Sequence, residues 1–113
     1  MKVSDVVYGA EIAGTDDFQF VVEVELGSGY HWDSLVAWWS PSKRKFFWLD
    51  GGGCSCDYLG MGVSRLDQFG VGNRDELTSA VRQKYDQSHR TSTGMASSLL
   101  ADLASVKTFR AVK

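Results

Sequence analysis

Two neighbouring segments of the chain are apolar at every position, and this feature constrains the fold more than any other. Residues 35–39 have the sequence LVAWW, and residues 46–49 have the sequence FFWL. Ser40, Pro41 and Ser42 lie between the two segments and favour a turn. Because successive side chains of a strand point to opposite faces, this pattern predicts a central hairpin with apolar side chains on both faces of a sheet.

The segment before the hairpin carries the clearest alternation in the chain. Residues 17–26 have the sequence DFQFVVEVEL, in which apolar and polar positions alternate except at Val21. The apolar positions are Phe18, Phe20, Val22, Val24 and Leu26. This pattern predicts a half-buried antiparallel strand with these five side chains on one face. A further strand is expected from Val3 to Ile12.

Two helices are predicted in the second half of the chain. Asn73 is an N-cap candidate and Glu76 stands three positions later, which is the spacing of a capping box, so a helix is expected over about 74–87. Apolar residues at helical spacing predict a second helix over about 94–107. The glycine-rich stretch 51–72 predicts a loop between the sheet and the helices.

The order of these elements predicts an α+β fold. An antiparallel sheet of three to five strands, formed by about residues 3–50, is packed by two C-terminal helices on one side. A chain of 113 residues is expected to form a single domain, residues 1–113. A small barrel-like sheet is the alternative architecture.

The hairpin leads into a short cysteine motif. The sequences WDSLVAWW and KFFWLD are followed by Gly-Cys-Ser-Cys and then by the helix with an acidic first turn. In this combination, over roughly residues 17–87, the chain resembles a group of small uncharacterised proteins encoded by actinobacteriophages. Members of that group commonly carry a proline after the second cysteine, where this chain has Asp57. The resemblance implies a phage origin and a setting in the host cytoplasm, and it implies no particular activity.

Cys54 and Cys56 form the first candidate site. Thiolates are soft ligands for zinc, which prefers four donors in a tetrahedron. His31 and His89 could supply the other two donors, with Asp57 as an oxygen alternative. Structural zinc sites usually separate their cysteines by two to four residues, so two other interpretations stay open. The cysteines could pack as small hydrophobic side chains, or they could act as a redox pair.

Two further motifs point toward other chemistry. His31, Asp33 and Ser34 are the components of a nucleophilic triad, but on a strand Ser34 points away from the other two, so enzymatic activity is not expected. The glycines 51–53 could form a backbone nest for an anion such as the phosphate of a nucleotide. A phosphate-binding loop would need a following lysine and a helix start, and the sequence CSCDYLG supplies neither.

A basic turn precedes the second strand of the hairpin. Lys43, Arg44 and Lys45 run directly into aromatic residues, which is the composition of a stacking platform for nucleic acid. The same composition is found in a solvated turn that leads into a core strand. The formal net charge of −2 argues against nucleic acid as the partner.

The four tryptophans all lie between residues 32 and 48. Two of them are adjacent, so on a strand they project to opposite faces, and helices on one side can cover only one face. The other face needs a second layer of the same domain, a second copy of the chain, or a different partner. Aromatic side chains are favoured anchors of protein interfaces. The residues expected at such an interface are Trp32, Trp38, Trp39, Trp48 and Phe47.

These patterns predict a non-enzymatic protein that binds another protein, or a second copy of itself, through an aromatic sheet face. The resemblance implies that it is a phage accessory protein and that its partner is a host or phage protein. No apolar run approaches the roughly 20 residues of a membrane span, and the N-terminus lacks the pattern of a secretory signal, so an intracellular location is expected. The resemblance implies that this location is the host cytoplasm. The alternative is a small metal- or nucleotide-binding factor that uses the GGGCSC loop and could counter a host defence. No cofactor is expected, unless the cysteines bind zinc.

Overall fold

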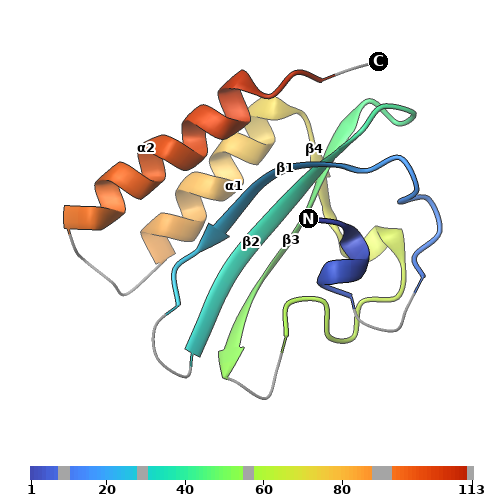
Figure 1. The fold of residues 1–113 in the computed structure, drawn as a ribbon, viewed down its shortest axis with the longest axis horizontal. Coiled ribbons are helices and arrows are strands. Elements are labelled where there is room, and N and C mark those ends of the chain that lie inside the picture. The colour runs from blue at the N-terminus through green and yellow to red at the C-terminus, as the bar shows by residue number, and fades with distance from the viewer. Residues whose placement is uncertain (8–10, 28–30, 55–57, 88–92, 112–113) are drawn as a thin grey trace.

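The computed structural model describes residues 1–7, 11–27, 31–54, 58–87 and 93–111. It has a four-stranded antiparallel sheet followed by two helices that lie on one face of that sheet (Figure 1). The strands are β1 (Gln19–Glu25), β2 (His31–Ser40), β3 (Lys45–Cys54) and β4 (Gly70–Gly72), and they are neighbours in chain order. The predicted α+β class is therefore confirmed, with four strands.

The β2–β3 hairpin is longer than the sequence pattern predicts. Its register runs from the pair Ser40 and Lys45 to the pair His31 and Cys54, so β3 passes through the three glycines. The predicted loop over 51–72 is therefore wrong at both ends, since residues 51–54 belong to β3 and residues 70–72 form β4. Backbone pairing with β2 overrides the poor strand propensity of glycine. A Cβ at Gly51 would lie 3.4 Å from the ring of Trp32, which is ordinary van der Waals contact.

A β-bulge in β1 divides its apolar side chains between the two faces of the sheet. The register of β1 against β2 shifts between Phe20 and Val22. Val22 and Val24 pack toward the helices, whereas Phe18 packs on the opposite face. The prediction of a single apolar face for this strand is therefore wrong. The extra residue, Val21, is the position that interrupts the alternation in the sequence.

The helices α1 (Arg74–Gln87) and α2 (Thr93–Thr108) cover the first face of the sheet. The predicted capping box is present, because the Asn73 side chain accepts a hydrogen bond from the N–H of Glu76 and the Glu76 side chain accepts one from the N–H of Asn73, at 2.8 and 3.1 Å. α1 packs against β2, β3 and β4, and α2 packs against β1. Residues of this core include Leu35, Trp39, Phe46, Leu77, Val81 and Val106.

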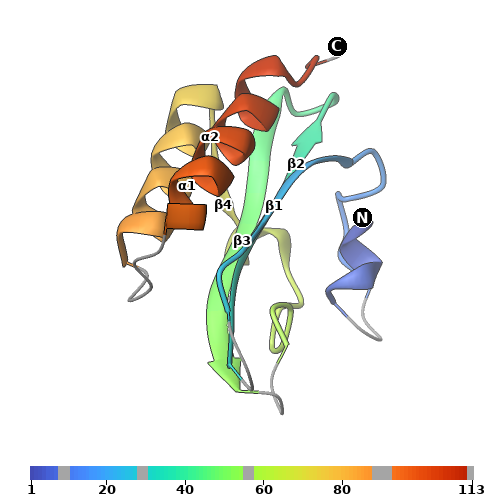
Figure 2. The ribbon, with the colours of Figure 1, turned by 60° about the vertical axis from the view of Figure 1, so that its left-hand side comes forward.

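The second face of the sheet is covered by the N-terminal segment and by the loop before β4 (Figure 2). The predicted strand from Val3 to Ile12 is wrong in its described part, where a 3-10 helix, η1 (Val3–Asp5), begins the chain. A second 3-10 helix, η2 (Leu66–Gln68), lies in the loop. The two covering segments meet where the N–H of Gly60 donates to the carbonyl of Val6 at 3.1 Å. Residues of this second core include Val3, Val7, Ile12, Trp38, Phe47 and Phe69.

Neither α1 nor α2, nor any other helix in the ranges that the structure describes, is long and apolar enough to cross a lipid bilayer.

Candidate functional site

The aromatic residues expected at an interface are mostly inside the molecule. The side chains of Trp38, Trp39 and Phe47 are only 0%, 7% and 6% exposed. Trp38 faces the N-terminal segment, where its indole N–H donates to the carbonyl of Met1 at 3.0 Å. The prediction that an apolar sheet face is left over for a partner is therefore corrected, because a second layer of the same chain covers that face.

Trp32 and Trp48 are partly buried, and each is held by a contact across the sheet. The indole N–H of Trp32 donates to the carbonyl of Cys54 at 3.0 Å. The indole nitrogen of Trp48 lies over Gly70, where an added Cβ would come within 2.2 Å of it. The Trp48 ring therefore fills the space that Gly70 leaves open.

The predicted metal ligands are only partly brought together. His31 and Cys54 are directly paired across β2 and β3, so their side chains leave the same face of the sheet. Cys56 and His89, and also Asp57, lie outside the described residues. Within the described ranges, no group of three or more histidine, cysteine, aspartate or glutamate side chains is placed to hold a metal ion.

The triad-like residues are engaged separately. The carboxylate of Asp33 forms an ion pair with Lys84, and the hydroxyl of Ser34 donates to the carboxylate of Glu25. Ser34 lies on the opposite face of β2 from His31, so these side chains form no nucleophile and base pair. The contacts of Asp33 and Ser34 therefore hold the end of the β2–β3 hairpin in place.

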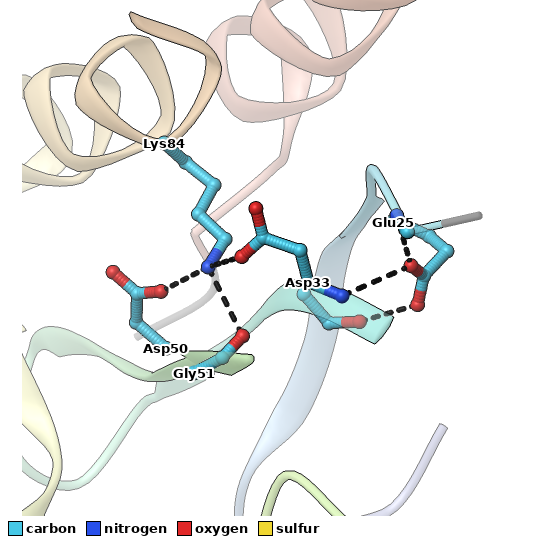
Figure 3. Close-up of polar contacts among 7 residues, drawn as sticks. Glu25, Asp33, Asp50, Gly51 and Lys84 are labelled. Atoms are coloured by element: carbon cyan, nitrogen blue, oxygen red, sulfur yellow. Dashed lines mark hydrogen bonds and ion pairs between the residues drawn. The ribbon is translucent and has the colours of Figure 1, made fainter. Parts of the chain in front are cut away.

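The most buried charged group in the described part of the chain is Lys84, and sequence reasoning missed it (Figure 3). Its ammonium contacts the carboxylate of Asp33 on β2, the carboxylate of Asp50 on β3 at 2.6 Å, and the carbonyl of Gly51 at 3.1 Å. Burial lowers the pKa of Lys84, but the bonds and charges of the two aspartates raise it by more, so the pKa lies above its ordinary value. Lys84 therefore stays protonated and connects α1 to both strands. We call this group the Lys84 clamp.

A signal for the clamp is present in the sequence. Lys84 follows Leu77 and Val81 at a spacing of seven and three residues, so it lies on the apolar stripe of α1. A charged residue on such a stripe must find a partner when the helix packs. The partners lie on two strands far away in the sequence, which local patterns do not reveal.

A surface groove lies beside β3 and β4, on the sheet face opposite the helices. Its volume is about 710 Å³. Val71, which is 46% exposed, pairs with Phe47 across the two strands, and both point into the groove. The lining residues are Lys43, Lys45, Phe47, Leu66, Asp67, Phe69 and Val71. We call this feature the β3–β4 groove.

The groove combines residues that the sequence assigned to different roles. Phe47 was expected at a protein interface, while Lys43 and Lys45 were expected to matter only for nucleic acid. Leu66, Phe69 and Val71 were missed because they lie in the stretch predicted as a loop. The alternation of Phe69 and Val71 with glycines is the signal that could have identified a strand there.

The basic turn at the rim of the groove is held in place by Asp17. The hydroxyl of Ser40 and the backbone N–H of Ser42 donate to its carboxylate at 3.0 and 2.8 Å. The hydrogen bond from the Ser42 side chain is the main cause that lowers the pKa of Asp17 below its usual value, and the bond from the Ser42 backbone adds to it. Lys43 donates to the carbonyl of Gly14 at 2.7 Å, and Arg44 adopts a positive φ of 55° at the tip. These contacts hold the backbone of the turn and the Lys43 side chain in place.

The acidic residue among the lining residues of the groove has a basic partner. Asp67 forms an ion pair with Arg65 at 3.2 Å, so the lysines leave the rim with an excess of positive charge. Among the described residues that line the groove, apolar side chains form the walls and lysines form the rim. The groove therefore has an apolar floor and a cationic rim, a combination that is common in binding sites.

The comparisons with known proteins identify a family. A family model described as "Domain of unknown function (DUF7574)" matches residues 14–108, a range that contains both the β3–β4 groove and the Lys84 clamp. No curated protein and no solved structure matches the chain.

Proposed function

The chain belongs to the DUF7574 family of domains of unknown function, and from this premise we propose that it is a non-enzymatic protein-binding domain that uses the β3–β4 groove. The single observation that carries the proposal is the groove itself, in which an apolar floor meets a cationic rim on an otherwise acidic chain. Binding sites on proteins commonly combine apolar walls with a few polar groups that fix orientation.

Burial elsewhere supports this choice of surface. The two sheet faces are packed by the helices and by the N-terminal cover, so they offer no large aromatic surface in the described part of the chain. Phe47 and Phe69 belong to the second core and also line the groove, so the groove is one of the places where that core reaches the surface. A partner that fills the groove would extend an apolar core that already exists.

The setting of this function is proposed from the resemblance of the aromatic hairpin and its cysteine motif to actinobacteriophage proteins. On this view the chain is a phage accessory protein in the host cytoplasm, and its partner is a host protein, a phage protein or a second copy of the chain. Sedimentation over a range of protein concentrations separates the last possibility from the other two.

Affinity capture with matched variants tests the proposal. Val71→Glu places a charge in the groove, whereas Leu100→Glu places the same charge on α2, where Leu100 is 69% exposed. We expect the wild type and Leu100→Glu to retain one partner from host cells that Val71→Glu loses, and the purified partner to bind with the same pattern. Equal capture by all three proteins, with circular dichroism showing all three folded, would contradict the proposal.

A second candidate function is zinc binding at the far end of the hairpin. The observation in its favour is the direct pairing of His31 with Cys54, which places a nitrogen and a sulfur donor on one face. Metal analysis of the purified chain, with His31→Ala as the variant, tests it. Stoichiometric zinc that disappears in the variant would support this function, and a metal-free wild type after purification with added zinc would reject it.

A further inference from the structure

We propose that the segment bound in the β3–β4 groove is an extended acidic peptide that adds to the outer edge of β4 as a fifth strand. The inference rests on the proposed function, because it names the partner chemistry of the same groove. Strand addition gives affinity through backbone hydrogen bonds and specificity through pockets for alternate side chains.

The two edges of the sheet differ in their readiness to pair. The β1 edge carries a bulge at Val21 and the exposed charged side chains of Glu23 and Glu25, which are devices that prevent edge pairing. β4 has the sequence Gly-Val-Gly, without charge, and no strand in the described ranges pairs with its outer side. Of the two edges, β4 is therefore the one open to an added strand.

The glycines of β4 keep this edge uncluttered. The space that a side chain at Gly70 would take is filled by the ring of Trp48, and the space at Gly72 is filled by Glu76. Val71 is thus the only side chain that β4 contributes, and it points into the groove. An added strand would approach the backbone of β4 without meeting a bulky side chain from that strand.

The groove sets the side-chain pattern of the added strand. Successive side chains of a strand alternate between faces, so every second residue of the peptide would point toward Phe47, Phe69 and Val71. Apolar residues at alternate positions fit this floor. The remaining side chains would point toward the helix side of the sheet edge or to solvent.

Charge complementarity selects an acidic peptide. Lys43, Arg44 and Lys45 are consecutive, all three are exposed, and Asp67 is already paired with Arg65. Residues 1–40 contain one lysine and seven acids, whereas residues 41–113 contain eleven bases and seven acids, so the basic turn begins the more basic part of the chain. Carboxylates on the peptide would approach the turn and avoid the acidic part of the surface.

The aromatic residues argue against single-stranded nucleic acid as the occupant. Binding of unpaired bases depends on exposed aromatic faces for stacking. Phe46 and Phe47, which follow the basic turn, are 2% and 6% exposed, so neither offers a free ring face. A peptide needs only apolar contact with the floor and backbone bonds from the edge.

Selection from a displayed library of random short peptides tests the inference. The wild-type chain is the bait and Val71→Glu is the counter-selection bait. We expect the selected sequences to carry apolar residues at alternate positions and flanking Asp or Glu. For the best synthetic peptide, we expect Lys45→Glu to weaken binding about tenfold and Lys107→Glu, which alters an exposed lysine on α2, to leave it unchanged. Methylation of the alternate peptide nitrogens that face β4 is expected to abolish binding, whereas methylation of the other alternate set, which faces away from the sheet, is expected to be tolerated.

The possible outcomes separate the two proposals. A groove peptide that still binds when each of the two alternate sets of nitrogens is methylated in turn would overturn strand addition and leave the protein-binding function standing. Selected sequences without acidic residues, or a single-stranded oligonucleotide that binds and is lost in Lys45→Glu, would overturn the acidic peptide. If no peptide is selected and Val71→Glu captures the partner as well as the wild type does, both the protein-binding function and the acidic-peptide proposal fail.

Discussion

At the residue scale, Lys84 shows how a single charged side chain can connect three elements. We expect Lys84→Met to lower the free energy of unfolding by about 1–3 kcal/mol. This is less than the roughly 3–5 kcal/mol for a fully buried pair, because the Asp33 and Asp50 side chains keep 37% and 47% of their exposure and water can solvate them. Urea denaturation measures the change, with Lys107→Met as the control. A loss equal to the control would show that the clamp does not stabilise the fold.

The clamp also has a defined pH dependence. The pKa of Lys84 is higher in the folded chain than its ordinary value of 10.5, so protonation favours the folded state. The stabilisation is fully present below pH 10.5 and is lost as the pH rises through the folded-state pKa. We expect the difference in unfolding free energy between the wild type and Lys84→Met to be constant from about pH 8 to 10 and to shrink above that range. A difference that grows in alkali would contradict the assignment.

At the scale of elements, the β2–β3 turn depends on Asp17. Asp17→Asn replaces one of the two accepting oxygens by an amide group, so we expect a loss of roughly 1–2 kcal/mol near neutral pH. The pKa of Asp17 is lower in the folded chain than its ordinary value of 3.8. The stabilisation of the fold by Asp17 is therefore fully present above pH 3.8, and it is lost as the pH falls through the lower folded-state pKa. Denaturation at several pH values, with Asp16→Asn as the control, measures both effects. Equal behaviour of the two variants would count against the anchoring role.

The contact between α1 and α2 has the opposite pH dependence. Burial raises the pKa of Asp102, and the hydrogen bond that its carboxylate accepts from Tyr85 only partly offsets this effect. Protonation of Asp102 therefore favours folding, and stability is lost as the pH rises from 3.8 through the folded-state pKa. Asp102→Asn retains an acceptor for the Tyr85 hydroxyl, so we expect its stability relative to the wild type to be greater near pH 7 than near pH 3.5. Urea denaturation at the two pH values decides this.

The elements differ in how far the sequence predicts them, and the reason is the range of the interactions involved. The bounds of α1 follow from Asn73 and Glu76, which are local signals, and its predicted range agrees with the structure. The extension of β3 through the glycines and the presence of β4 depend on pairing with distant strands, which overrides local propensity. In the groove, Lys45 and Phe47 could be selected from composition, but Leu66 and Phe69 could not, because their proximity to β3 is a tertiary property.

At the scale of the whole molecule, the sheet is a middle layer between helices and an irregular N-terminal cover. Val7 is 2% exposed in this cover, so Val7→Asp is expected to detach it by burying a charge without a partner. We expect exchange of the Trp38 indole N–H, which donates to Met1, to accelerate at least about tenfold while amides of the helix-side core change little. Met61→Asp, at a 51% exposed position, is the control. Uniform acceleration throughout the chain would mean that the cover is not a separate layer.

The Lys84 clamp has a further consequence for how the native chain opens. Because one ammonium binds β2, β3 and α1 together, the far end of the hairpin cannot separate without releasing the C-terminal half of the helix. Amide protons around residues 33–36, 49–52 and 81–85 should therefore exchange with a shared opening free energy, as one cooperative unit. The groove lies toward the other end of β3, near Lys45, so a ligand could enter and leave it while this unit stays closed.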